Sequence, residues 1–315
     1  MAITTAPKMT RRPTPADSTF RYMCLGAGVL VLIVLGLITY TMTTKSWDAF
    51  SHMGLSFFTD KRWDIANQHY GALSYIFGTL YSATIAILLA IPLSLGIALF
   101  TTQVAPLWLK RPITYLIDLL AVVPSVVWGL WGALVLAAPI RTFFNHIHDI
   151  FKRVPVLGTI FGAAQGKSFS TAGIILAVMI IPIITSLSRE VMETVPPTDR
   201  EGALALGATR WEMIKGTVLP HSRTGIIGAV MLGLGRAMGE TIAAALVIGG
   251  AAQISSNAFA SGDSLPAVIA NQWSEADTLQ KSALIGLAMT LFAMTLIVNL
   301  VANSVVNRSE RRRAI

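Results

Sequence analysis

Six apolar stretches without acidic or basic runs recur along the chain, separated by polar segments. About 20 residues of α-helix cross the roughly 30 Å of hydrocarbon in a bilayer. Lipid offers the backbone no hydrogen-bonding partner, so each stretch should be a helix; the alternating pattern of a membrane β-barrel is absent. The pattern therefore predicts an all-α integral membrane protein with six transmembrane helices. The predicted spans are Met23–Met42, Tyr75–Phe100, Ile113–Ala138, Thr171–Leu187, Ile226–Gly249 and Leu284–Val306.

The composition agrees with a protein whose solvent is lipid. Hydrophobic residues make up 54% of the 315 residues and charged residues only 13%, about half the charged fraction of a soluble protein. The first span is longer than the core of a secretory signal, about 7–15 residues, and no small-residue cleavage site follows it before Lys45, so it is expected to stay as an anchor.

The distribution of lysine and arginine predicts the orientation. With the N-terminus in the cytoplasm, the inner segments hold 15 of these residues and the outer segments 8. The positive-inside rule then places both ends in the cytoplasm of a multi-pass cell-membrane protein. Basic residues beside anionic membrane lipid explain the net charge of +8, and no nucleic-acid partner is expected. Cys24 is the only cysteine, which excludes an intrachain disulfide and a cysteine-based metal site.

The polar segments divide the chain into a tail at residues 1–19, predicted to be disordered, a membrane domain at 20–307 and a basic tail at 308–315. The outer segment "RTFFNHIHDIFKRV" is apolar on one face and predicts a helix in the membrane interface. His146 and His148 point apart at this spacing, so no metal site is expected. The stretch "FGAAQGKS" has Phe161 where a phosphate loop needs glycine, so no ATPase site of the chain's own is expected.

The inner loop 188–223 has the strongest local signals. "PPTDREGALALGATRWEMIKGTVLPHSRTG" predicts two short helices joined by a turn at Gly207, with capping boxes at Thr198-x-x-Glu201 and Thr209-x-x-Glu212 and an end at Pro220. Both ends of this helix pair are tethered to the membrane and few residues could read bases, which argues against DNA binding. The pair is interpreted as a docking element for a soluble protein.

"EGALALGATRWEMIKGTVLP" resembles the EAA loop, E-A-A-x3-G-x9-I-x-L-P, of the permease subunits of type I ABC importers. Two positions depart from it, Gly202 for alanine and Thr217 for isoleucine. The resemblance implies that this loop couples the membrane helices to a separate ATPase, with no cofactor in this chain because the partner uses the ATP. By residue match, the coupling residues are Glu201, Gly202, Ala203, Gly207, Leu219 and Pro220.

Three further segments narrow the resemblance to phosphate-importer permeases of the PstC type: "HYGALSYIFGTLYSA", "VPSVVWGLWG" and "GRAMGET". This implies a phosphate importer with a second permease of the PstA type, two cytoplasmic ATPase subunits and an external phosphate-binding protein. The alternatives are the PstA-type subunit itself or a permease for another oxyanion. A secondary transporter is a weaker alternative, because it would leave the inner loop without a role.

"LGLGRAMGETIAAAL" contains the only two charges between Thr224 and Gly262, Arg236 and Glu240. Ionisable groups at membrane depth are costly and usually face the interior of a bundle. At i,i+4 on one helix the two are expected to pair, and Gly235 and Gly239 would let another helix approach closely. The planar fork of arginine suits an oxyanion, so both residues are predicted to line the substrate pathway; a purely structural ion pair is the alternative.

Overall fold

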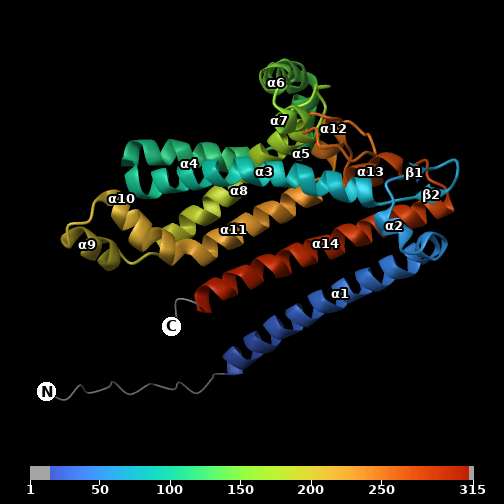
Figure 1. Ribbon diagram of the computed structural model, residues 1–315. Helices are drawn as coiled ribbons and strands as arrows, with labels where there is room; N and C mark the ends of the chain where they lie inside the picture. Colours follow the sequence, from blue (N-terminus) through green and yellow to red (C-terminus); the bar gives the residue numbers. More distant parts are fainter. Residues whose placement is uncertain (1–14, 312–315) are drawn as a thin grey trace. The chain divides into compact units, whose positions relative to one another are not determined.

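The computed structural model describes residues 15–311, most of which are helical (Figure 1). The chain forms two units, residues up to Lys45 and residues from Ser46 onward. Helix α1, Pro15–Met53, is much longer than the predicted span. It includes residues 15–19 of the predicted tail, while residues 1–14 of that tail lie outside the described part. At the other end, α14, Thr278–Arg311, continues into the predicted basic tail, and residues 312–315 are not described.

Three helices form the centre of the second unit: α3 (Leu73–Leu99), α8 (Phe169–Glu193) and α11 (Leu219–Gly239). Helix α8 packs against both of the others. Small residues allow this close packing: a Cβ atom on Gly173 would lie 2.6 Å from Ile85, and one on Gly233 would lie 2.8 Å from Ile184. The core between the three helices is made of alanine, leucine, isoleucine and methionine side chains.

Shorter elements connect and cover these helices. Three π-helical turns interrupt the helical segments: η1 (Phe100–Val104), η2 (Gly132–Leu136) and η3 (Ile214–Val218). The other helices of the described residues are α2 (Ser56–Thr59), α4 (Leu107–Val122), α5 (Ser125–Trp131), α6 (Ala137–Phe151), α7 (Pro155–Ile160), α9 (Pro197–Ala205), α10 (Arg210–Met213), α12 (Ile242–Val247) and α13 (Leu265–Gln272).

Five helical segments of the described residues are long and apolar enough to cross a membrane. They are Ser18–Met53, Leu73–Val104, Ser125–Phe151, Phe169–Glu193 and Thr278–Ala302. Two predicted spans are not single helices. The third is divided at Val123–Pro124, where both residues are extended (ψ 123° and 142°), because a residue before proline is disfavoured in the helical region. The fifth is divided at Glu240, which separates α11 from α12.

The two ends of this unit differ in structure (Figure 1). One end holds α9 and α10, which correspond to the predicted inner helix pair. The other end holds α13 and a short antiparallel hairpin, β1 (Trp63–Asp64) and β2 (His69–Tyr70), with Trp63 opposite Tyr70. The side chains of His69, in the hairpin, and Asp60 are joined by a hydrogen bond. The N–H of Arg62 and the side chain of His69 lower the pKa of Asp60.

The predicted helix in the outer segment 141–154 is confirmed by α6. Phe144 is buried and stacks on Phe259 with ring centroids 4.0 Å apart. Among residues 15–311, His148 stands in no group of three or more metal-binding side chains. Its Nδ1 lies 2.7 Å from the carbonyl oxygen of Phe161. The Asn145 side chain also accepts the N–H of Ala164, and Phe151 contacts the ring of Phe161, so ring contacts and hydrogen bonds both hold the helix to the outer loops.

Candidate functional site

The inner helix pair, α9 and α10, forms as predicted around Gly207. This glycine has φ +86°, a left-handed conformation that side chains disfavour. The Thr209 hydroxyl accepts the N–H of Glu212, and the Glu212 carboxylate accepts the N–H of Thr209, which confirms the second capping box. The N–H and the hydroxyl of Thr209 both donate to the Glu212 carboxylate and lower its pKa.

Two predictions about this pair are wrong. No side chain caps α9: Pro196 occupies the N-cap position, so Thr198 and Glu201 already lie inside the helix and form no capping box. Pro220 does not close the second helix either. The chain continues from α10 through the π-helical turn η3 into α11, where Pro220 stands in the first turn. That position tolerates proline because the first turn of a helix needs no N–H from it.

The six predicted coupling residues divide into exposed and supporting positions. Glu201, Gly202 and Gly207 are exposed, and a Cβ on either glycine would meet nothing within 4 Å. Ala203 and Leu219 instead pack partly against a buried apolar cluster beneath the pair, and Pro220 is half-buried. Only the first three therefore stand ready to contact another protein.

Three large apolar side chains that the motif did not indicate are also exposed on this pair: Leu204, which is 43% exposed, Leu206 and Trp211. Leu206 is 91% exposed and Trp211 is 62% exposed. Such side chains are common at protein–protein interfaces, and tryptophan is often among their strongest contributors. A leucine directly before the turn glycine of a polar loop was the signal available in the sequence.

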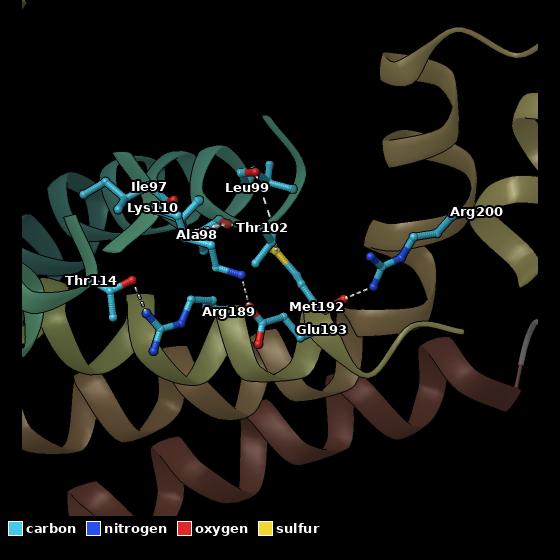
Figure 2. Close-up of polar contacts among 11 residues, drawn as sticks. Ile97, Ala98, Leu99, Thr102, Lys110, Thr114, Arg189, Met192, Glu193 and Arg200 are labelled. Carbon is cyan, nitrogen blue, oxygen red and sulfur yellow. Dashed lines mark hydrogen bonds and ion pairs between the residues drawn. The ribbon is translucent and has the colours of Figure 1, made fainter. Parts of the chain in front are cut away.

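Arg200 fastens the pair to the end of α8 (Figure 2). Its Nη2 atom donates to the carbonyl oxygens of Met192 and Val195, each at 2.9 Å. These carbonyls lie at the helix C-terminus, where no intrahelical N–H is available to them. The guanidinium thus supplies the missing donors and joins α9 to α8.

Beside this joint, polar contacts tie α4 to α8 (Figure 2). Lys110 and Glu193 form an ion pair of 2.8 Å, and Arg189 donates to the hydroxyl of Thr114 at 2.7 Å. The loop, the end of α8 and the start of α4 are therefore connected by side chains rather than by apolar packing alone.

The predicted pairing of Arg236 with Glu240 is wrong. Helix α11 ends at Gly239 and Glu240 is extended, with ψ 123°, so the i,i+4 relation of a continuous helix does not hold. The Glu240 carboxylate instead accepts the N–H of Ala243 at the start of α12, at 3.3 Å. Within the described residues Arg236 is exposed and has no hydrogen bond or ion pair.

The glycines next to Arg236 face away from the other helices of the chain. A Cβ on Gly235 or Gly239 would meet nothing within 4 Å, whereas Gly225 and Gly233, also on α11, press against α8. One face of α11 is therefore packed and the other is open at backbone distance. Arg236 and Leu232, which is also exposed, belong to the side of the helix not covered by α8.

A cavity of about 390 Å³ lies near the far end of α12, lined by Ala137, Ala138, Arg141, Gln165, Gly166, Lys167, Gly249 and Ser261. Gly166 and Gly249 have φ +93° and +112°. A Cβ on Gly249 would lie 2.0 Å from the Ser261 hydroxyl, so this wall requires glycine. Two basic residues and no acidic ones line the cavity.

Comparison with known proteins decides the family. The family described as "Binding-protein-dependent transport system inner membrane component" matches residues 90–315. The chain belongs to this family. As an inner membrane component it is a multi-pass membrane subunit that works with other components of an ABC transporter.

Individual relatives of this inner membrane component extend over nearly its whole length. It is 40% identical over 302 residues to the "Phosphate transport system permease protein PstC" of Haemophilus influenzae, covering 94% of this chain and 95% of the relative. It is also 40% identical to the protein of the same name from Mesorhizobium japonicum, covering 96% and 93%.

A solved structure supports the fold. A bacterial ABC transporter "involved in the import of the acidic polysaccharide alginate" superimposes with a TM-score of 0.59 at 16% identity, covering 93% of this chain and 98% of the other. The predicted permease fold of type I ABC importers is thus confirmed.

Proposed function

We propose that this chain is the permease subunit of an ATP-driven importer for inorganic phosphate and forms half of its translocation pathway. The proposal is supported by the names of the 40% identical relatives. The structural observation that carries it is Arg236, a guanidinium at membrane depth without a partner among the described residues of its own chain. Such a charge is expensive in lipid unless water, another subunit or an anion meets it.

Arg236 provides suitable chemistry for phosphate. Its planar guanidinium donates two parallel hydrogen bonds to two oxygens of an oxyanion, which a lysine does not do. Glu240 stands at the interruption between α11 and α12, where its carboxylate caps α12. In this position it can also accept an O–H of monoprotonated phosphate, so Arg236 attracts the anion and Glu240 selects its protonated oxygen.

The open glycine face of α11 is the proposed contact with a second permease of the PstA type. Gly235 and Gly239 leave the backbone accessible there, as helix pairs in membranes require. Two such permeases would enclose a pathway with Arg236 on its wall. An external phosphate-binding protein would supply substrate from the outer side, and the proposed orientation keeps both termini in the cytoplasm.

The helix pair α9–α10 is the proposed docking element for one of two cytoplasmic ATPase subunits. Its exposed residues, Glu201, Leu206 and Trp211, would meet the ATPase, while Arg200 joins the pair to α8. ATP would be bound and hydrolysed by that partner, and this chain would hold no cofactor.

Uptake of labelled phosphate tests the function. Cells that lack their own high-affinity phosphate system would receive the full four-part transporter, with or without this chain, and uptake would be measured alone and with excess sulfate or molybdate. We expect uptake that requires the chain and resists both competitors. Competition by either anion would assign another oxyanion. If the assembled, ATP-hydrolysing complex takes up no phosphate, the substrate assignment is wrong while the permease fold stands.

A further inference from the structure

A second cavity of about 390 Å³ opens between α4 and the end of α8, next to the joint made by Arg200. Its walls contain three basic side chains, one carboxylate and two hydroxyl groups. They belong to Leu107, Lys110, Arg111, Thr114, Tyr115, Arg189 and Glu193. The cavity therefore has a net positive charge and many hydrogen-bond donors.

Two of the three basic side chains have partners in α4 or α8, as Figure 2 shows. Glu193 neutralises Lys110, and one nitrogen of Arg189 donates to Thr114. Arg111 is exposed and makes no hydrogen bond or ion pair with the described residues. Arg111 and Tyr115 stand at i,i+4 on α4, so both reach the same side of the helix. A guanidinium and a phenol are thus available together for an anion.

An apolar wall continues from this cavity along α4. Trp108 is 75% exposed and Val122, at the far end of the helix, is 78% exposed. Between them the exposed apolar side chains include Tyr115, Leu116 and Leu119. A cavity with a net positive charge at one end of an exposed apolar helix has the two parts of a phospholipid site: donors for the headgroup and a surface for acyl chains.

We infer that this cavity binds the phosphodiester headgroup of an anionic membrane lipid, with its acyl chains along the outer face of α4. The guanidiniums of Arg111 and Arg189 would hold the phosphodiester oxygens, and the Tyr115 hydroxyl would donate to the same group. A small soluble anion would use the same donors but would gain nothing from the apolar wall, which is why lipid is the assigned source.

The position of the lipid gives it a role beyond the substrate pathway. Glu193, in the cavity wall, directly follows Met192, whose carbonyl oxygen accepts a hydrogen bond from Arg200 of the inner helix pair α9–α10, called the coupling pair from here on because of its proposed role. A bound headgroup would hold α4 against the segment of α8 that anchors α9. Anionic lipid is therefore expected to stabilise the coupling pair in its docked arrangement.

Lipid binding to the purified complex tests the inference without any measurement of transport. The complex in neutral detergent would be titrated with short-chain phosphatidylglycerol or phosphatidylcholine, and bound lipid counted by native mass spectrometry. Arg111→Gln is the main variant, since it disturbs no contact within the described residues; Tyr115→Phe is the milder one. Arg223→Gln, an exposed basic residue of α11 outside the cavity, is the matched control.

We expect the unaltered complex to retain phosphatidylglycerol in preference to phosphatidylcholine, and Arg111→Gln to weaken this binding about 10-fold, the cost of one charge-assisted contact. Tyr115→Phe should weaken it less, and Arg223→Gln should leave it unchanged.

Equal binding of the two lipids, or equal loss in Arg111→Gln and Arg223→Gln, would overturn the inference. Displacement of the lipid by inorganic phosphate or glycerol 3-phosphate at similar concentration would assign the cavity to a small anion instead. Binding to the isolated chain but not to the complex would show that another subunit covers α4, and would also overturn it.

Discussion

The coupling pair and the segment around Glu240 both interrupt the helical chain, but they do so with different means. At the coupling pair, a left-handed Gly207 and the Thr209–Glu212 capping box turn the chain within six residues. At Glu240 there is neither proline nor left-handed glycine; two residues, the extended Glu240 and the helical Thr241, separate α11 from α12, and the Glu240 carboxylate accepts the N–H of Ala243 in the second helix. The first interruption is made by local chemistry, and the second depends on packing around it.

The two interruptions also leave different groups uncovered. The coupling pair presents apolar Leu206 and Trp211 on the side where water is expected. The Glu240 segment presents the charged Arg236 where lipid would be expected. Apolar side chains are unfavourable in water, and a charged side chain is unfavourable in lipid. Leu206 and Trp211 therefore require a protein surface that covers them, and Arg236 requires a polar ligand or another subunit.

Removing the charge at the membrane segment should have the largest effect. Arg236→Ala is expected to reduce phosphate uptake about 100-fold, as the loss of a bidentate charge-assisted contact predicts. Arg236→Lys should restore part of the rate, since it keeps the charge but not the fork. Uptake would be measured beside the amount of assembled complex. Normal uptake by Arg236→Ala would mean that Arg236 has a structural role and does not act on the substrate.

Removing the apolar groups at the coupling pair should affect ATPase docking instead. The double change Leu206→Ser with Trp211→Ala is expected to weaken ATPase binding about 10- to 100-fold, because two large side chains no longer become buried on docking. Binding would be measured on the permease in detergent with the purified ATPase. Trp273→Ala, which removes an exposed tryptophan beside α13 at the opposite end of the unit, is the control and should bind normally. If both variants weaken ATPase binding to a similar degree, the ATPase does not dock on these two side chains of the coupling pair.

Two carboxylates, one near each end of the unit, should make stability depend on pH in opposite directions. Asp263, in the loop after α12, is buried, and burial raises its pKa from 3.8 to about 6, whereas the pKa of Glu212 is lowered by the backbone and hydroxyl of Thr209. Since the folded pKa of Asp263 is raised, its contribution to stability is complete below pH of about 4 and is lost as the pH rises through about 6. For Glu212 the sign is reversed, and its contribution is lost as the pH falls through its lowered pKa.

Asp263→Asn should therefore stabilise the protein at pH 7 by about 3 kcal/mol relative to the unaltered chain and leave it nearly unchanged at pH 4. The amide oxygen can still accept the N–H of Ser264, as the carboxylate does. Thermal unfolding of the detergent-solubilised chain across this pH range measures the difference. A constant difference at all pH values would mean that the ionisation of Asp263 is not its cause.

The caps themselves should give the smallest effects. Thr209→Ala and Glu240→Ala each remove one side-chain acceptor at a helix start and should cost about 1 kcal/mol of local stability. Hydrogen exchange would show this loss at α10 for the first and at α12 for the second. Glu240→Gln keeps an acceptor oxygen and should protect α12 normally. If Glu240→Ala leaves α12 equally protected, neighbouring helices and not the cap hold that interruption in place.

These differences explain how far the sequence could predict the structure. The turn at Gly207 and the box at Thr209 were predictable because all their determinants lie within a few residues. The end predicted at Pro220 was wrong because the π-helical turn before it, which the residue pattern does not mark, lets the helix continue. The apolar stretch across Glu240 similarly conceals the end of α11, so the pairing with Arg236 expected from a continuous helix was wrong.

The candidate site was predicted in part for the same reason. The motif indicated Glu201, Gly202 and Gly207, which the structure leaves exposed, but not Leu206, Trp211 or Arg200. A motif gives positions that recur in a family, whereas exposure and the partners of a guanidinium depend on how the loop packs beneath. The cavity at α4 and α8 joins residues about 80 positions apart and has no sequence signal.

The two hydrogen bonds from Arg200 to the end of α8 have a mechanical consequence. The Met192 carbonyl belongs to the last turn of α8 and the Val195 carbonyl lies two residues past its end, and a single side chain of α9 holds both. A force that draws α9 away from the membrane is then transmitted along the helix as tension, through hydrogen bonds that resist stretching. A sideways force meets only a single side chain with rotatable bonds. The joint is stiff in one direction and compliant in the others, so a motion of the docked partner reaches the bundle chiefly as displacement along α8.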